Sequence, residues 1–159
     1  MGKFLGVVVS AIGRQTETYV AEHIATLAPD HTAVCALNPT EKVSWAPEQP
    51  LKRLYRSDWR SVEITRRLLS LTSRRALERL DMARFGLSLA KHHIEVVLCE
   101  YLPVAVAVLG TCRRMRIPVV AHAHGFDISA VPRSSEWAET YSKSLPLMSD
   151  IVVVSNAMK

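Results

Sequence analysis

The residues best suited to do chemistry are two histidines and an aspartate in the stretch HAHGFD, residues 122–127. The apolar residues IPVVA come directly before this stretch, as at the end of a buried strand. His122 and His124 are two positions apart, so on an extended chain they face the same side. An imidazole there could hydrogen-bond sugar hydroxyls or phosphate oxygens, or transfer a proton. The stretch is therefore either the mouth of a site or an ordinary polar turn.

The histidine pair alone is a weak candidate for a metal site. Catalytic zinc usually takes three protein ligands, and the nearest third candidate is Asp127, across the turn. The sequence therefore predicts no bound metal, and it predicts His122 as a hydrogen-bonded polar residue at the end of the sheet. His124 is the better functional candidate, because its neighbour Gly125 allows the backbone to approach a ligand closely.

A second polar stretch, SAIGRQTE at residues 10–17, contains a single glycine, Gly13. It matches neither G-x-G-x-x-G nor G-x-x-x-x-G-K-[ST], which disfavours a dinucleotide site and a phosphate-binding P-loop. Arg14 could contact an anion. Thr16 and Glu17 open a helical pattern, and the simplest interpretation is that they cap the helix. The chain also contains no G-x-S-x-G and no D-x-D, which disfavours an α/β-hydrolase and a metal-chelated sugar-nucleotide site.

The composition is that of one globular domain, with 48% hydrophobic and 22% charged residues in 159 positions. No run reaches the about 20 apolar residues that span a bilayer, and the start of the chain does not resemble a secretory signal. A cytoplasmic protein is therefore expected. The three cysteines are far apart in apolar sequence, which predicts buried thiols in a reducing compartment.

Apolar strand-like runs alternate with helical patterns along the chain. This alternation predicts an α/β domain, a doubly wound and mostly parallel sheet with helices on both faces, of the Rossmann-like kind. The predicted strands are residues 3–10, 31–37, 94–101, 117–123 and 150–155, and the predicted helices are 16–28, 81–93, 103–116 and 135–148, with helical periodicity in 51–80 as well.

Ligands bind such sheets beyond the carboxyl ends of the strands. Four polar loops fall at that edge: SAIGRQTE, EYLP, HAHGFD and SN. The edge therefore adds Tyr101 and Ser155 to the candidate residues. Four converging loops favour a site at HAHGFD over an ordinary turn.

Three stretches together resemble the amino-terminal domain of bacterial family 4 glycosyltransferases. QTETYVAEHIATLA is similar to the S-E-T-F stretch that opens their first helix, IPVVAHAHGFDIS to their H-G-x-D turn, and SDIVVVSNAMK to the strand that follows. Their order and approximate spacing agree across nearly the whole chain. Thr16 occupies the position of the motif's usual serine, and Tyr19 occupies the position of its usual phenylalanine.

The resemblance implies a retaining transfer of a sugar from a nucleotide-sugar donor, without a metal or other cofactor. The acceptor would be a glycan or a lipid-linked molecule in cell-surface polysaccharide synthesis. His124 matches the histidine that contacts the donor sugar and its phosphate, and is the expected catalytic residue. The expected donor- or acceptor-binding residues are Gly13, Arg14, Thr16, Glu17, Tyr101, Gly125, Asp127 and Ser155. Asp127 could have only a structural role.

Family members have two Rossmann-like domains, and the resemblance makes residues 1–159 the amino-terminal, acceptor-side one. The donor-binding domain with its E-x7-E motif is expected to be missing from this chain, which predicts a truncated domain that is inactive in isolation. The alternative is a non-catalytic α/β binding module for a phosphorylated or glycan ligand in the same crevice.

The net charge of +5 comes mainly from residues 51–80, which hold nine Lys or Arg against three Asp or Glu. Such a run is either a solvated helix face or a surface that adsorbs to anionic lipid at the inner face of the plasma membrane. Aromatic stacking and helix-turn-helix patterns are absent from the sequence, so nucleic acid is not an expected partner.

Overall fold

The computed structural model describes residues 4–11, 18–37 and 74–158. Four candidate site residues, Gly13, Arg14, Thr16 and Glu17, lie outside the described residues. Residues 51–73, which make up most of the basic segment, also lie outside the described residues. Their assignments stay predictions. Within the described residues, no helix has the length and apolar character needed to cross a membrane.

The core of the fold is a five-stranded sheet in the order β2-β1-β3-β4-β5. Every pairing is parallel, which confirms the predicted α/β class. Valine is the commonest residue of the central strands, and Val7, Val8, Val97 and Cys99 are fully buried because both faces of the sheet are covered there. The strands are β1 Phe4–Val9, β2 Thr32–Ala36, β3 Ile94–Glu100, β4 Val119–Ala123 and β5 Asp150–Val153.

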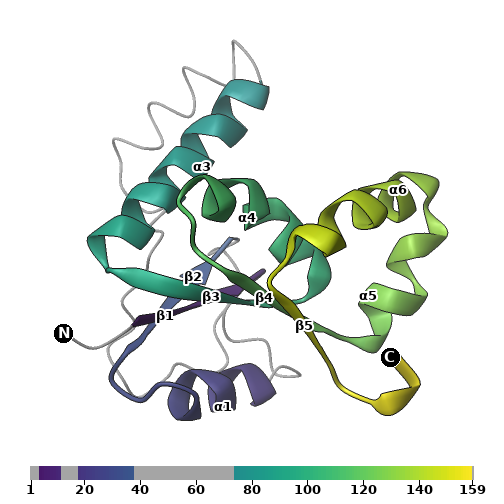
Figure 1. The fold of residues 1–159 in the computed structure, drawn as a ribbon, viewed down its shortest axis with the longest axis horizontal. Helices are drawn as coiled ribbons and strands as arrows, with labels where there is room; N and C mark the ends of the chain where they lie inside the picture. Colours follow the sequence, from purple (N-terminus) through teal and green to yellow (C-terminus); the bar gives the residue numbers. More distant parts are fainter. Residues whose placement is uncertain (1–3, 12–17, 38–73, 159) are drawn as a thin grey trace.

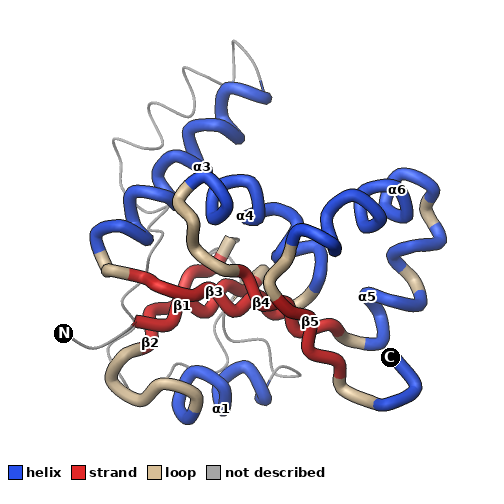
Figure 2. The backbone as a smooth tube through the Cα atoms, viewed as in Figure 1, coloured by secondary structure: helices blue, strands red, loops and turns tan. Residues whose placement is uncertain are grey.

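Helices cover both faces of this sheet, as predicted (Figure 1). Helix α1 packs on one face, and α3, α4 and α6 pack on the other (Figure 2). Two separate apolar clusters result, one built around α1 and the larger one around α3 and α4. The helices are α1 Thr18–Thr26, α3 Arg74–Lys91, α4 Leu102–Arg114, the short α5 Gly125–Ser129 and α6 Ser135–Ser144, with 3-10 turns at Val131–Arg133, Leu145–Leu147 and Asn156–Met158.

Two helix boundaries differ from the sequence prediction. The end of the basic segment and the next predicted helix form one continuous helix, α3, instead of separating at residue 81. Phe85 and Leu89 lie one turn apart in α3 and are both buried, so a single apolar stripe holds the helix to the sheet. Helix α6 ends at Ser144 rather than 148, because Pro146 cannot donate a backbone hydrogen bond and the chain tightens into a 3-10 turn.

The connection from β3 to α4 passes through a strained residue. Tyr101 has φ of 80°, a backbone conformation that residues with side chains rarely adopt. Pro103 follows in the first turn of α4, as predicted, where its missing N–H costs nothing. The strain at Tyr101 directs the chain from the end of β3 straight into α4, at the carboxyl edge of the sheet.

The three cysteines are free, buried and part of the same core cluster, as predicted. Burial raises the pKa of the Cys35 and Cys112 thiols to about 12. It also raises the pKa of Cys99, and the neighbouring thiols raise it further. All three groups are therefore protonated, and poor nucleophiles, at neutral pH.

We expect the folded protein to react very slowly with a thiol reagent such as Ellman's reagent at pH 8, because buried protonated thiols are neither accessible nor nucleophilic. After unfolding in guanidinium, all three thiols should react. Absorbance of the released chromophore measures both rates. Rapid reaction of one equivalent in the folded protein would contradict the burial of these thiols.

Candidate functional site

Alternation along β3 and β4 places three polar side chains on the same face of the sheet. Leu98 packs in the apolar cluster of α1, while Cys99 points into the larger cluster on the opposite face. Glu100 is next in the alternation and therefore faces α1. It lies directly opposite His122 in the parallel register. His124 follows two positions later, on the same side as His122, as the sequence predicted.

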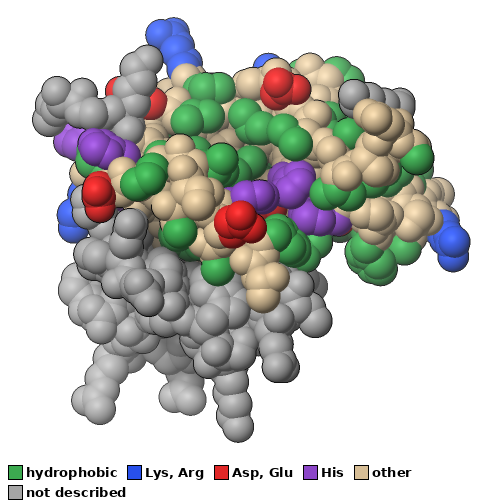
Figure 3. All heavy atoms as spheres, turned by 90° about the horizontal axis from the view of Figure 1, so that it is seen from below, with side chains coloured by type: hydrophobic (Ala, Val, Ile, Leu, Met, Phe, Trp, Pro, Cys, Tyr) green, Lys and Arg blue, Asp and Glu red, His purple; other side chains and the backbone are tan. Residues whose placement is uncertain are grey.

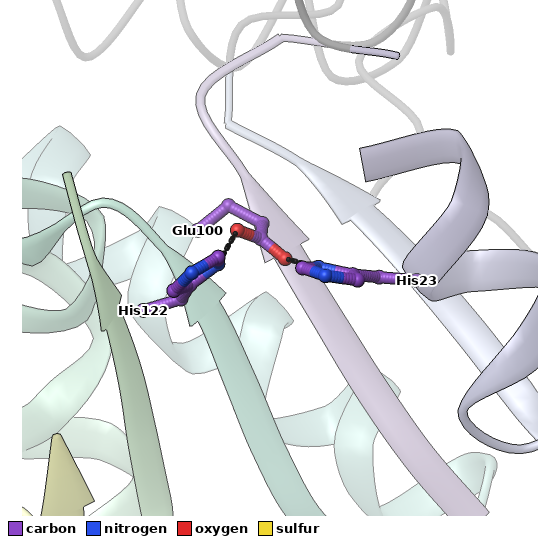
Figure 4. Close-up of side chains that lie close together, drawn as sticks. All are labelled: His23, Glu100 and His122. Carbon is purple, nitrogen blue, oxygen red and sulfur yellow. Dashed lines mark hydrogen bonds and ion pairs between the residues drawn. The ribbon is translucent and has the colours of Figure 1, made fainter. Parts of the chain in front are cut away.

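The carboxylate of Glu100 is the centre of this arrangement. One of its oxygens lies 2.7 Å from His23 Nδ1, and the other lies 2.8 Å from His122 Nδ1 (Figure 4). His124 Nε2 approaches the second oxygen at 3.5 Å. We call His23, Glu100, His122 and His124 the histidine–glutamate cluster. His23 comes from α1, so the cluster joins a helix to two strands across the crevice.

The charge of the cluster is unusual for a protein interior. Glu100 is 0% exposed, and within the described part of the chain its charged partners are all imidazoles. A buried carboxylate needs hydrogen-bond donors to offset its lost hydration. A carboxylate can only accept, so Nδ1 of His23 and of His122 each donate to it. In a neutral ring this leaves Nε2 as the acceptor.

His124 is packed between two tyrosine rings. Its ring centroid lies 4.8 Å from that of Tyr19 and 4.6 Å from that of Tyr101. The hydroxyl groups of these two tyrosines hydrogen-bond to each other. His122 is close as well, with its ring centroid 4.4 Å away. Helix α1, β3 and β4 therefore each contribute a ring to one aromatic group at the edge of the sheet.

The His124 side chain is only 16% exposed, and within the described part of the chain its buried Nε2 makes no hydrogen bond shorter than its 3.5 Å approach to Glu100. Burial lowers the pKa of His124, and the neighbouring His122 lowers it further. Glu100 and Asp127 oppose this shift without reversing it. The lowered pKa favours the neutral ring at pH 7, and the long 3.5 Å separation of Nε2 from Glu100 leaves room for a closer bond from this nitrogen to a ligand. Figure 3 looks at the molecule from the side of α1 and shows histidine side chains gathered near the middle of the described surface.

Asp127 was considered from the sequence as a possible metal ligand, but in the structure it binds backbone N–H groups. Its carboxylate is buried and accepts hydrogen bonds from the backbone N–H of His124 at 3.1 Å and of Leu102 at 3.0 Å. It thereby caps α5 and ties the end of β4 to the start of α4. The expected turn is a short helix, and Asp127 supports the position of His124 through the backbone.

The remaining predicted residues are divided between the site and the surface. Tyr101 lies in the site, beside His124. A Cβ atom at Gly125 would meet nothing within 4 Å, so close packing does not require a glycine there. Ser155 is exposed after the end of β5. Neither of these two residues belongs to the histidine–glutamate cluster.

Two members of the cluster, His23 and Glu100, were not identified from the sequence. Glu100 ends the apolar run IEVVLCE, and a charged residue in a buried strand indicates a partner nearby. His23 lies one helical turn after Tyr19, on the side of α1 that faces the sheet edge. The cluster lies over the carboxyl ends of β3 and β4, next to the point between β1 and β3 where the order of the strands reverses, and such points are the usual ligand position in these sheets.

A groove of about 1020 Å³ lies between α3 and α4, on the opposite face of the sheet. Its lining is mostly apolar, as at Met82 and Leu87, and its charged members are Arg79 and Arg114. The lining residues include no imidazole and no carboxylate, so the groove offers apolar contact and positive charge without acid–base chemistry. The histidine–glutamate cluster is the better candidate site.

In comparisons with known proteins, the chain matches no protein-family model and no curated protein sequence. The Rossmann-like α/β fold and the geometry of the cluster are therefore the basis for any functional proposal.

Proposed function

We propose that this chain is the acceptor-side half of a retaining glycosyltransferase. It would move a sugar from a nucleotide-sugar donor to a glycan or lipid-linked acceptor. One observation carries the proposal: among the described residues the buried Nε2 of His124 makes no close hydrogen bond, and it lies at the carboxyl edge of the sheet in an H-G-x-D sequence. This is the position at which the resembled transferases hold the histidine that contacts the donor.

The neutral state of His124 suits this role. A neutral ring with a proton on Nε2 donates one hydrogen bond, which can stabilise an oxygen of the donor sugar or of the departing phosphate. Asp127 fixes the backbone of His124, and the rings of Tyr19 and Tyr101 restrict its rotation. A donor that needs no reorganisation during the reaction stabilises developing charge most effectively.

We propose that the protein binds its acceptor at the cytoplasmic face of the plasma membrane. The support is the charge of residues 51–80, with nine basic against three acidic residues, which favours contact with anionic lipid. This contact would hold the protein at the surface where a lipid-linked acceptor is found. Candidate binding residues in the first loop, including Gly13, Arg14, Thr16 and Glu17, would complete the donor side.

Transfer is tested directly with the protein expressed from its whole reading frame. The protein is incubated with radiolabelled uridine-, guanosine- and adenosine-diphosphate sugars and with a lipid extract containing glycan-linked lipids. We expect label from one donor to enter the acceptor fraction, and we expect proton NMR of the product to show the anomeric configuration of the donor.

Two results would contradict the transferase. The first is inversion of the anomeric configuration. The second is saturable binding of a sugar phosphate or glycan with no transfer to any acceptor, which would instead support the non-catalytic binding module.

A further inference from the structure

The histidine–glutamate cluster brings together more metal-binding atoms than the transfer requires. The ligand atoms of His23, Glu100 and His122 all lie within 4.8 Å of one another. His124 Nε2 lies 3.5 Å from the same carboxylate. We propose that His23, Glu100 and His122 bind a divalent transition-metal ion, and that Zn²⁺ is the ion best suited to them.

The donor set selects the class of ion. Two imidazole nitrogens and one carboxylate oxygen suit Zn²⁺ and its neighbours Co²⁺, Ni²⁺ and Cu²⁺, whereas Mg²⁺ and Ca²⁺ prefer oxygen donors throughout. Three protein ligands with an open fourth position form a common zinc arrangement. Six histidines occur in the chain, and three of them meet here.

Small movements would convert the hydrogen-bonded cluster into a metal site. Zinc bonds of about 2.0–2.1 Å place neighbouring donors of a tetrahedron about 3.3 Å apart. The two nitrogens now lie 2.7 and 2.8 Å from the carboxylate oxygens, so side-chain shifts of about 1 Å suffice. Glu100 and His122 are held in register on adjacent strands. His23 lies on a surface helix and is 27% exposed, so it is the ligand free to adjust.

Charge also favours an ion at this position. The buried Glu100 carboxylate is now balanced only by hydrogen bonds from imidazoles, within the described residues. A divalent cation at bonding distance would offset that charge far more strongly. When the ion binds to Nδ1 of His23 and His122, the proton on each Nδ1 moves to Nε2 of the same ring, which points away from the carboxylate (Figure 4). Each imidazole therefore binds the ion as a neutral ring and releases no proton.

This site does not rest on the proposed transfer, and the transfer does not call for the ion. The test therefore measures binding alone, on the whole chain without a polyhistidine tag. The protein is dialysed against a series of ZnCl₂ concentrations in a non-chelating buffer, and bound zinc is measured by elemental analysis. We expect one zinc per chain. Co²⁺ in place of Zn²⁺ should give the visible absorption bands of a four-coordinate site.

Alanine variants distinguish the cluster from other histidines. His23→Ala and His122→Ala should each weaken zinc binding by at least about 100-fold, because removing a ligand costs no less than removing a group that only orients one. The matched control is His31→Ala, which removes an imidazole that is exposed and bonds to its own loop at Pro29. This control should bind zinc like the unaltered chain.

His23→Ala decides the question if His122→Ala fails to fold, since His23 lies on the surface of α1 and circular dichroism can verify that the fold persists. Less than one equivalent of bound zinc at saturation would overturn the proposal. So would equal weakening by His23→Ala and His31→Ala, because the bound zinc would then lie on scattered surface imidazoles.

Discussion

In a full-length or reconstituted enzyme, replacing His124 with alanine should lower the turnover of the proposed sugar transfer by about 100-fold or more, while the protein stays folded. Nε2 of His124 lies 3.5 Å from the Glu100 carboxylate, which keeps its shorter bonds to His23 and His122 when the ring of His124 is removed. The fold depends instead on the backbone of this residue, which Asp127 holds. The measurement is the initial rate of label transfer from the active nucleotide sugar, together with circular dichroism of the variant.

The matched control is again His31→Ala, at the opposite end of the sheet, before β2. It removes an imidazole of the same size and should leave the transfer rate unchanged. A His124→Ala variant that transfers sugar as fast as the control would exclude His124 from the mechanism. The position of the ring between Tyr19 and Tyr101 would then be explained by packing alone.

Replacing Asp127 with alanine should lower the free energy of unfolding by about 3 kcal/mol. The same carboxylate oxygen accepts from two backbone N–H groups, those of Leu102 and His124. Both donors would lose their partner, that of Leu102 at a buried position and that of His124 at a partly buried one, and each such loss costs about 1–3 kcal/mol at full burial. Equilibrium unfolding in urea, followed by circular dichroism, measures the change.

Two further variants make the interpretation of Asp127→Ala specific. Asp127→Asn keeps one accepting oxygen and a similar shape, so it should lose less stability than the alanine variant. Glu139→Ala removes an exposed carboxylate that pairs with Lys143 on the surface of α6, and should change the midpoint very little. Equal midpoints for Asp127→Ala and Glu139→Ala would show that the two backbone bonds contribute nothing to stability.

The sheet could be predicted from the sequence because its strands are local features. Each is a short apolar run, and runs of this kind alternating with helical patterns give parallel sheets. The common side of His122 and His124 could be predicted for the same reason, since the two-residue period of a strand is fixed by its geometry. The start of α3 could not be predicted, because an aspartate such as Asp81 is compatible with the first turn of a helix and also with its interior. The packing of Phe85 and Leu89 against the sheet is consistent with one continuous helix.

The partners within the site could not be predicted, since they meet through the fold. His23 and Glu100 are 77 residues apart in the chain and are joined only when α1 packs against the sheet. Asp127 bonds to the backbone of Leu102 across 25 residues. The sequence does contain one trace of the cluster, the acidic Glu100 at the end of an apolar strand. It indicates a buried partner without saying which of the six histidines supplies it.

The left-handed backbone of Tyr101 has a cost for the stability of the fold. A glycine would adopt φ of 80° without strain, and would relieve a backbone cost of about 1–3 kcal/mol. Glycine would also remove the ring that packs against the core, bonds to Tyr19 and lies beside His124. The tyrosine thus holds a strained backbone in exchange for aromatic contacts that a glycine could not make, and the crevice is built at the expense of backbone stability.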